Sequence, residues 1–155
     1  MEQLIVGKSL EMQLAALLDT LPSDATVSYM VTRLNEGEEA TIVASSKETI
    51  VHTGASMVKT LILEYVFHLA AQEQLDLNDT IALSRSPRVE GAGALMELVG
   101  NHSFSYLELC RLMMVLSDNW ATNLLIQALG MENINARAEQ LGLEHFEINR
   151  CLLYT

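Results

Sequence analysis

Residues 105–130 read SYLELCRLMMVLSDNWATNLLIQALG, and the main features of the fold can be predicted from this stretch. Ser105 followed three residues later by Glu108 is a capping-box pattern, which predicts a helix over residues 106–116. That helix is so rich in apolar residues that we expect it to be buried on nearly all sides. A second apolar helix is predicted over residues 120–129, because a glycine follows its last apolar residue.

The two helices are interrupted by three short polar residues, Ser117, Asp118 and Asn119. This triplet is expected by chance in only about one chain in fifty of this length. Short polar side chains at such a break can cap the second helix and also turn into a cleft. The plainer interpretation is a helix cap alone, since Asp118 is a favoured capping residue.

Upstream, Ser56 and Lys59 stand three residues apart at the start of a helix predicted over residues 56–73. That spacing puts the hydroxyl and the amine on one face of the helix. The amine can act as a base if its pKa is lowered, and apolar neighbours such as Val58 and Leu61 favour this by desolvation. The helix N-terminus also points backbone N–H groups at an oxyanion formed at Ser56. The alternative is a solvated lysine on an ordinary helix, so the pattern gains weight only together with the triplet.

The rest of the chain predicts a helix, a β-hairpin and further short helices, which makes the fold class α+β. Residues 75–80 are predicted to form a polar turn, and Gly91-Ala92-Gly93 lies in a loop. The remaining predicted elements are helices over residues 3–20, 94–99 and 132–141, and strands over residues 27–31 and 40–45 joined by a turn at residues 35–38.

Composition excludes several classes of function. Nine basic against twenty acidic residues give a net charge of −11, which argues against nucleic-acid partners. No apolar run is long enough to cross a bilayer, and the first residues lack a basic-then-apolar signal, so we expect a cytoplasmic protein or an exported one whose signal was removed. The four histidines show no ligand spacing, so no metal or cofactor is predicted. Cys110 and Cys151 could pair, but Cys110 lies in an apolar helix where a free thiol is favoured.

The order and separation of these motifs closely resemble class A β-lactamases and related serine hydrolases over residues 27–150. The resemblance implies a β-lactamase-like fold, with an N-terminal helix and hairpin beside a cluster of helices. It is carried by Ala55-Ser56-Met57-Val58-Lys59, Gly91-Ala92-Gly93, Leu107-Glu108-Leu109, Met114-Val115-Leu116-Ser117-Asp118-Asn119-Trp120-Ala121-Thr122-Asn123 with the following Leu124-Leu125-Ile126, and Leu141-Gly142-Leu143.

What the resemblance implies is acyl transfer from a small-molecule β-lactam or a peptide amide. Ser56 would attack the carbonyl, and Lys59 would help to activate the hydroxyl. Ser117 would relay a proton to the leaving nitrogen, and Asn119 would hydrogen-bond the substrate's side-chain amide. These four residues form the expected site.

The resemblance also implies two supporting residues. Asp118 would bond nearby backbone, and Asn123 would support the loop that positions the deacylating base. The sequence departs from the family where that base is expected, because no Glu-x-x-x-Asn segment follows Arg150 and both Glu144 and Glu147 come too early. The Lys-Thr-Gly strand that lines the pocket in such proteins does not follow either.

These departures lead us to interpret residues 1–155 as a single, incomplete domain, with a helix and hairpin in residues 1–50 and a helical part in residues 51–150. The C-terminal strands of the family sheet are missing from this sequence, so the chain is expected to be an N-terminal fragment or a truncated gene product, and such a chain could pair with a complementing segment or another chain. With one oxyanion donor and the base missing, we expect this chain alone not to turn over substrate.

Two alternatives to a β-lactamase remain open from the sequence. One is a penicillin-binding relative, either a peptidase or an antibiotic sensor, which would be acylated at Ser56 but would deacylate poorly. The other is a non-catalytic helical interaction domain in which the serines only cap helices. The enzymatic interpretations require Ser56, Lys59 and Ser117 to meet in one cleft, with Lys59 buried and bonded to Ser56 or Asn119.

Overall fold

The computed structural model describes residues 9–34, 36–37 and 39–152 of the chain. The chain forms two compact units, Met1–His52 and Thr53–Thr155. Both helices and strands are present, so the predicted α+β class is confirmed. None of the described helices is long and apolar enough to span a bilayer.

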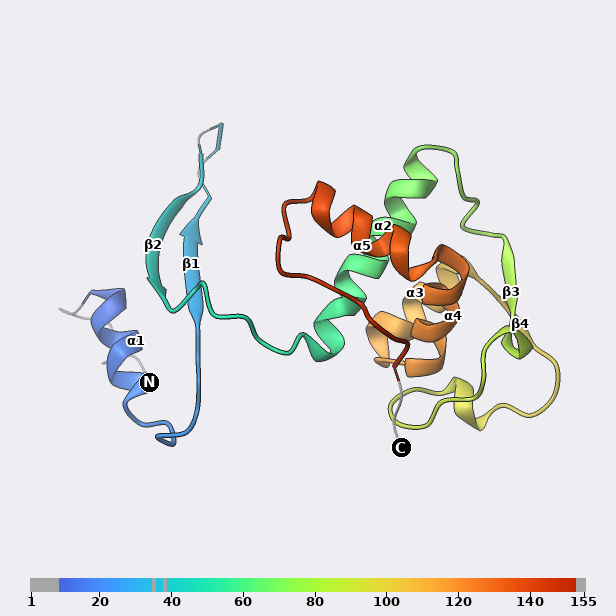
Figure 1. The fold of residues 1–155 in the computed structure, drawn as a ribbon, viewed down its shortest axis with the longest axis horizontal. Coiled ribbons are helices and arrows are strands. Elements are labelled where there is room, and N and C mark those ends of the chain that lie inside the picture. Colours follow the sequence, from blue (N-terminus) through green and yellow to red (C-terminus); the bar gives the residue numbers. More distant parts are fainter. Residues whose placement is uncertain (1–8, 35, 38, 153–155) are drawn as a thin grey trace. The chain divides into compact units, whose positions relative to one another are not determined.

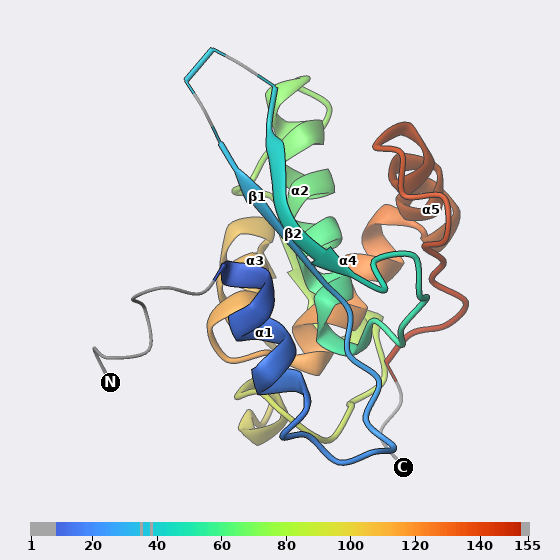
Figure 2. The same ribbon diagram turned by 90° about the vertical axis from the view of Figure 1, so that its left-hand side faces the viewer.

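The first unit consists of a helix and a hairpin, namely α1 (Leu10–Leu18), β1 (Tyr29–Arg33) and β2 (Thr41–Ser46) (Figure 1). The two strands are antiparallel, as Figure 2 shows, and their register shifts between Val31 and Thr32. Helix α1 contacts β2, and Ala44 is the buried residue of that strand. The predicted hairpin is confirmed, with each strand starting one or two residues later than expected.

The helix predicted over residues 3–20 is present as α1, with residues 3–8 lying outside the described residues. The Ser9 hydroxyl accepts a hydrogen bond from the Met12 N–H and caps the first turn. Of the predicted turn, residues 36–37 are described, and Gly37 there adopts a φ of +77°. Asn35 and Glu38 lie outside the described part.

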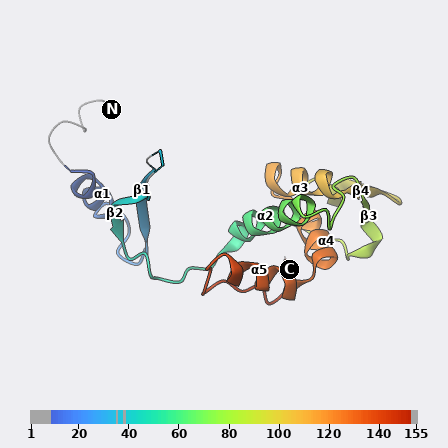
Figure 3. The same ribbon diagram turned by 90° about the horizontal axis from the view of Figure 1, so that it is seen from above.

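The second unit is built on four helices that share one apolar core. Figure 3 shows α4 between α5 and the small ladder formed by β3 and β4. Residues at the centre of the core, such as Ile62, Leu109 and Leu125, are fully buried. The elements are η2 (Ala55–Met57), α2 (Val58–Ala71), β3 (Thr80–Ala82), η3 (Leu83–Arg85), η4 (Leu95–Glu97), β4 (Ser103–Ser105), α3 (Tyr106–Val115), α4 (Asn119–Leu129) and α5 (Met131–Gln140), where η marks a 3₁₀ turn.

Helix α3 begins with the predicted capping box. The Ser105 hydroxyl accepts from the Glu108 N–H at 3.2 Å, and the Glu108 carboxylate accepts from the Ser105 N–H at 2.8 Å. The expected burial on nearly all sides is wrong, because Val115 is 79% exposed and Met114 and Leu116 are also exposed. One face of α3 packs against α2 and α4, and the apolar residues near its end lie off that face.

Helix α4 has the buried position that was expected of α3. Nine of its eleven residues are buried, including the polar residues Asn119, Thr122 and Asn123. Buried polar side chains need hydrogen-bond partners, and each of these three has one. The central helix of the unit therefore carries polar groups whose partners come from other segments or from its own first turn.

Two parts of the second unit differ from the prediction. The segment predicted as a polar turn runs into β3, which pairs antiparallel with β4, with Ile81 opposite Phe104. Strands of three residues are too short to show a period in the sequence. The helix predicted over residues 94–99 is only the 3₁₀ turn η4, which follows Gly93 at positive φ and ends at Leu98, where the backbone is extended with a ψ of 141°.

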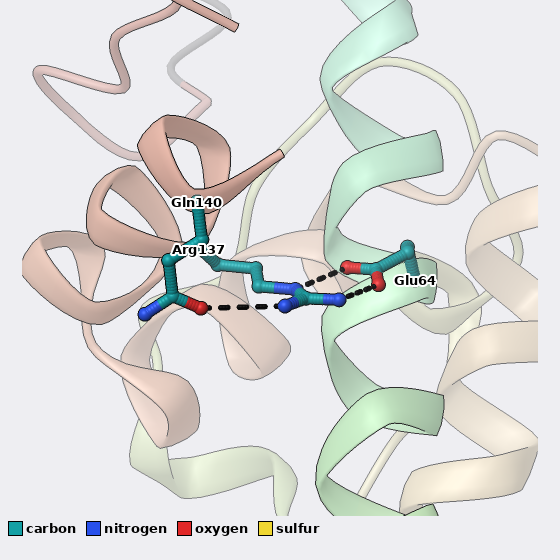
Figure 4. A network of polar contacts seen from close by, with 3 residues as sticks. All are labelled: Glu64, Arg137 and Gln140. Atoms are coloured by element: carbon teal, nitrogen blue, oxygen red, sulfur yellow. Dashed lines mark hydrogen bonds and ion pairs between the residues drawn. The ribbon is translucent and has the colours of Figure 1, made fainter. Parts of the chain in front are cut away.

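An ion pair joins α5 to α2. The Arg137 guanidinium donates from Nε to Glu64 Oε2 at 3.0 Å and from a terminal nitrogen to Oε1 at 2.5 Å. Gln140 Oε1 accepts a further bond from Arg137 at 3.3 Å, as Figure 4 shows. The hydrogen bonds from Arg137 lower the pKa of Glu64. Since Glu64 is 37% exposed, the pair contributes at most about 1 kcal/mol, but its two-pronged geometry fixes the position of α5 on α2.

Candidate active site

Ser56 lies at the entry to α2, in the 3₁₀ turn η2. The helix was predicted to start at Ser56, but α2 begins at Val58, two residues later. The turn is closed by a hydrogen bond from the Met57 N–H to the Gly54 carbonyl at 2.8 Å, and Ala55 before Ser56 has a φ of +42°. Ser56 is exposed, so its hydroxyl is accessible to a substrate.

Lys59 lies one turn further along α2 and is only 3% exposed. Its Nζ contacts four oxygens: Ser117 Oγ at 2.7 Å, the Ser117 carbonyl at 2.8 Å, Asn119 Oδ1 at 3.1 Å and Ser56 Oγ at 3.3 Å. The predicted burial of Lys59 and its bonds to Ser56 and Asn119 are confirmed. A buried amine with four oxygen neighbours is held in one position.

The charge state of Lys59 follows from its surroundings. Burial lowers the pKa of the Lys59 amine from its usual 10.5, and the nearby Asp118 carboxylate opposes this shift. The Ser117 carbonyl and Asn119 Oδ1 can only accept, so they use two N–H bonds of the amine. In the neutral form the remaining lone pair faces the Ser56 and Ser117 hydroxyls, as a base for either proton requires.

Ser117 occupies the junction between α3 and α4. Its φ of +53° lies in the left-handed region, which non-glycine residues rarely adopt. This conformation turns both its carbonyl and its hydroxyl toward Lys59. The Ser117 and Ser56 hydroxyl oxygens are 3.3 Å apart, so the predicted meeting of these two residues with Lys59 is confirmed.

Asp118 is 1% exposed, and its carboxylate binds backbone from two segments. Oδ2 accepts from the Ala94 and Leu95 N–H groups at 2.7 and 2.9 Å, and Oδ1 accepts from the Ala121 N–H at 2.9 Å. Asp118 therefore caps α4 and also holds the loop that contains Gly93. The triplet is therefore more than a plain helix cap, because Asp118 caps α4 while its neighbours Ser117 and Asn119 contact Lys59.

Asn123 follows Asn119 by one turn of α4 and is 2% exposed. Its side chain accepts from the Leu152 N–H and donates to the Leu152 carbonyl, both at 2.8 Å. Sequence reasoning placed a supporting role on Asn123 but did not identify Leu152 as its partner. This pairing has no local signal in the sequence, since the two residues are 29 positions apart.

A second asparagine forms the same kind of pair and was missed entirely. Asn135 on α5 accepts from the Ile148 N–H at 2.8 Å and donates to the Ile148 carbonyl at 3.1 Å. A single asparagine in a polar helix carries no recognisable pattern. Gly93 was also missed as a close neighbour of Asp118, although the Gly91-Ala92-Gly93 loop was noted.

Other reactive groups lie outside this cluster. Among the described residues, no three His, Cys, Asp or Glu side chains come close enough together to hold a metal ion. Cys110 and Cys151 are both free thiols, which settles the alternative that the sequence left open. Burial raises the pKa of the Cys110 thiol to about 11, so it is protonated at neutral pH.

We expect the pKa of Lys59 to lie below 10.5 when its ¹⁵Nζ resonance is titrated by NMR, because burial disfavours the ammonium form. Asp118→Asn keeps an acceptor for the Ala121 N–H but removes the charge that opposes the shift. This variant should therefore lower the pKa of Lys59 further. A titration at or above 10.5 in the folded protein would mean that burial does not dominate the charge state of this amine.

We expect Gly93→Ala to destabilise the protein by about 1–3 kcal/mol more than Gly100→Ala does, in thermal or urea unfolding. Both glycines have positive φ, +127° and +100°, so both variants carry backbone strain. A Cβ at Gly93 would lie 2.3 Å from Asp118 Cγ, whereas a Cβ at Gly100 meets no atom within 4 Å. Equal losses of stability would show that the loop can move away from Asp118 at no cost.

Comparison with known proteins identifies the family of this chain. A profile of the Beta-lactamase enzyme family matches residues 9–154. Among curated proteins, the β-lactamase BRO-1 of Moraxella catarrhalis is 31% identical over 112 residues, covering 67% of this chain and 36% of that protein.

Solved structures with the same fold include PBP-A, with a TM-score of 0.71 and 26% identity over 92% of this chain and 52% of that one. A mutant of PBP-A in an acyl-enzyme complex with penicillin G gives a TM-score of 0.73, with 26% identity over 91% of this chain and 52% of that one. A β-lactamase from Sphaerobacter thermophilus gives 0.69, with 26% identity over 80% of this chain and 46% of that one. The chain thus spans 36% of the curated relative and about half of the solved ones. Since the profile covers nearly all of its residues, the chain belongs to the β-lactamase enzyme family.

Proposed function

We propose that this chain carries the acylation site of a serine hydrolase that acts on β-lactams or related peptide amides, with Ser56 as the nucleophile. The observation that carries the proposal is the buried Lys59 amine, 3.3 Å from Ser56 Oγ and 2.7 Å from Ser117 Oγ. A lysine that only stabilised a helix would extend into solvent, where its charge costs nothing. Membership of the β-lactamase family supports the same reaction class.

In the proposed reaction, neutral Lys59 takes the proton of the Ser56 hydroxyl as Ser56 Oγ forms a bond to the carbonyl carbon of the amide. The tetrahedral intermediate then collapses and the carbon–nitrogen bond breaks. The proton passes from Lys59 through the Ser117 hydroxyl to the nitrogen, which becomes an amine that is released from a peptide amide and stays attached to the acyl group when the ring of a β-lactam opens. The products are an ester on Ser56 and an unchanged Lys59, so atoms and charge balance.

Asn119 is proposed to orient the substrate. Its Oδ1 is occupied by Lys59, which fixes the side chain and leaves the Nδ2 donor for a carbonyl of the bound molecule. Its backbone N–H donates to the Ala92 carbonyl at 3.0 Å, so the residue is held by both the loop and α2. Such preorganisation reduces the entropy lost when substrate binds.

The test is covalent labelling with a fluorescent penicillin, followed by mass spectrometry of the labelled peptide. We expect one label on Ser56, none on Ser56→Ala, and labelling slowed at least about a hundredfold in Lys59→Met. The labelling rate should rise with pH through the lowered pKa of Lys59, because the neutral amine is the base. Ser84→Ala, which alters an exposed serine in η3, is the control and should label normally.

A chain that takes no label while folded would instead favour the non-catalytic interaction domain. A label on another residue would contradict the assignment of Ser56.

A specific observation favours a second candidate, a penicillin-binding protein that forms the acyl-enzyme but releases it slowly. The resemblance to class A β-lactamases assigns Asn123 to the loop that holds the deacylating base, and the residue Asn123 holds is Leu152. A leucine side chain cannot take a proton from water. The fold is also shared with PBP-A, of which a mutant has been solved as an acyl-enzyme complex with penicillin G.

Leu152→Glu decides between the two candidates, with Leu152→Gln as a control of similar shape that has no basic group. If the wild-type protein is a slow-releasing penicillin binder, the Glu variant should shorten the lifetime of the acyl-enzyme by about a hundredfold, and the Gln variant should not. The lifetime is measured by loss of fluorescent label after excess ligand is removed. Rapid loss in the wild-type protein, unchanged in the Glu variant, would favour a β-lactamase whose base lies elsewhere.

A further inference from the structure

We propose that Asn135 is a positioning residue of the same site, because it fixes the segment of residues 148–152 and so determines where Leu152 lies relative to Lys59. This inference rests on the proposed acylation at Ser56. It concerns a residue on α5, a helix that contributes no side chain to the cluster around Lys59. Residues 148–152 are instead tethered to α5 and to α4 at two separate points.

The amide of Asn135 pairs with the backbone of Ile148 in both directions. It accepts from the Ile148 N–H at 2.8 Å and donates to the Ile148 carbonyl at 3.1 Å. The side chain of Ile148 is 8% exposed and belongs to the apolar core of the unit. The backbone of Ile148 is therefore held in place by hydrogen bonds as well as by burial.

Asn123 forms an equivalent pair with Leu152, four residues further along. Within the described part of the chain, these two asparagines supply the hydrogen bonds that hold the backbone of residues 147–152. Asn149 and Arg150 between the two pairs are exposed. A segment held at Leu152 alone could pivot about that point, whereas two points four residues apart fix its path.

The two anchor points are tied to the site from opposite sides. On α4, Asn123 is four residues, or about 6 Å of rise, from Asn119, which contacts Lys59. On α5, Asn135 is two residues from Arg137, whose ion pair with Glu64 joins α5 to α2, as Figure 4 shows.

Helix α2 also carries Lys59. The contacts thus form a closed path from Lys59 through α2, α5, the 148–152 segment and α4 back to Lys59. Removing the Asn135 amide opens this path at one step and leaves every contact of Lys59 intact. For that reason, removing the Asn135 amide should affect deacylation of the ester more than acylation of Ser56.

The test compares Asn135→Ala with Asn133→Ala, an asparagine on the same helix whose amide bonds only the Leu129 carbonyl among the hydrogen bonds of the described residues. The first readout needs no activity, because trypsin can cleave after the exposed Arg150 when the segment opens. We expect cleavage there to be roughly five- to thirtyfold faster in Asn135→Ala and unchanged in Asn133→Ala, as lost hydrogen bonds of this kind would produce.

The second readout is the split between acylation and deacylation with a fluorescent penicillin. Asn135→Ala should change the acylation rate by less than about threefold and shorten the acyl-enzyme lifetime by at least about threefold, because a displaced Leu152 admits water to the ester. Asn135→Asp keeps the acceptor for the Ile148 N–H and loses the donor, so it should fall between wild type and Asn135→Ala in both readouts. If Asn135→Ala does not fold, the Asp variant decides.

Unchanged cleavage after Arg150 would overturn the tether itself. Faster cleavage with an unchanged lifetime, or equal slowing of acylation and deacylation, would make Asn135 a stabilising residue without a positioning role. If the wild-type protein takes no penicillin at all, the proposed function fails, and the positioning role fails with it even where trypsin confirms the tether.

Discussion

The buried carboxylate of Asp118 holds together the elements that form the site in the second unit. A carboxylate that is 1% exposed is costly unless hydrogen bonds compensate for the lost water, and three backbone N–H groups do so here. Two come from residues 94–95 and one from the first turn of α4, so one side chain fixes the loop, the helix start and the turn between α3 and α4. The left-handed conformation of Ser117 persists because its neighbours on both sides are held in this way.

The same carboxylate has an electrostatic consequence. It raises the pKa of Lys59 while burial lowers it, and burial is the larger effect. The site thus places a negative charge close enough to make burial of an amine tolerable, yet leaves the amine easier to deprotonate than a free lysine. This balance is what the proposed base at Lys59 requires, because a fully compensated ammonium could not accept a proton from Ser56.

Asparagine side chains hold the surroundings of the site together. Asn119 contacts Lys59, Asn123 pairs with Leu152, and Asn135 pairs with Ile148. An asparagine amide offers a donor and an acceptor side by side, so it can pair with one backbone unit as a neighbouring strand would. The segment of residues 147–152, which has no regular secondary structure, gains a defined path from such pairs. In the proposed reaction, α2 and the α3–α4 junction carry the groups for acylation, and the tethered segment is proposed to influence hydrolysis of the ester.

Local sequence patterns were enough to predict the α+β class, the hairpin and the capping box of α3, whereas the grouping of Ser56, Lys59, Ser117 and Asn119 was predicted from the joint motifs and the resemblance to class A β-lactamases. Periodicity, capping residues and short motifs act over a few residues, so they can be recognised without knowing the rest of the fold. Long-range contacts, in contrast, made α4 and not α3 the fully buried helix and paired β3 with β4. They also set the partners of Asp118, Asn123 and Asn135. The hydrogen bonds that tether Ile148, Leu95 and Leu152 join residues 13, 23 and 29 positions apart. The residues in between carry no signal of which partners will meet.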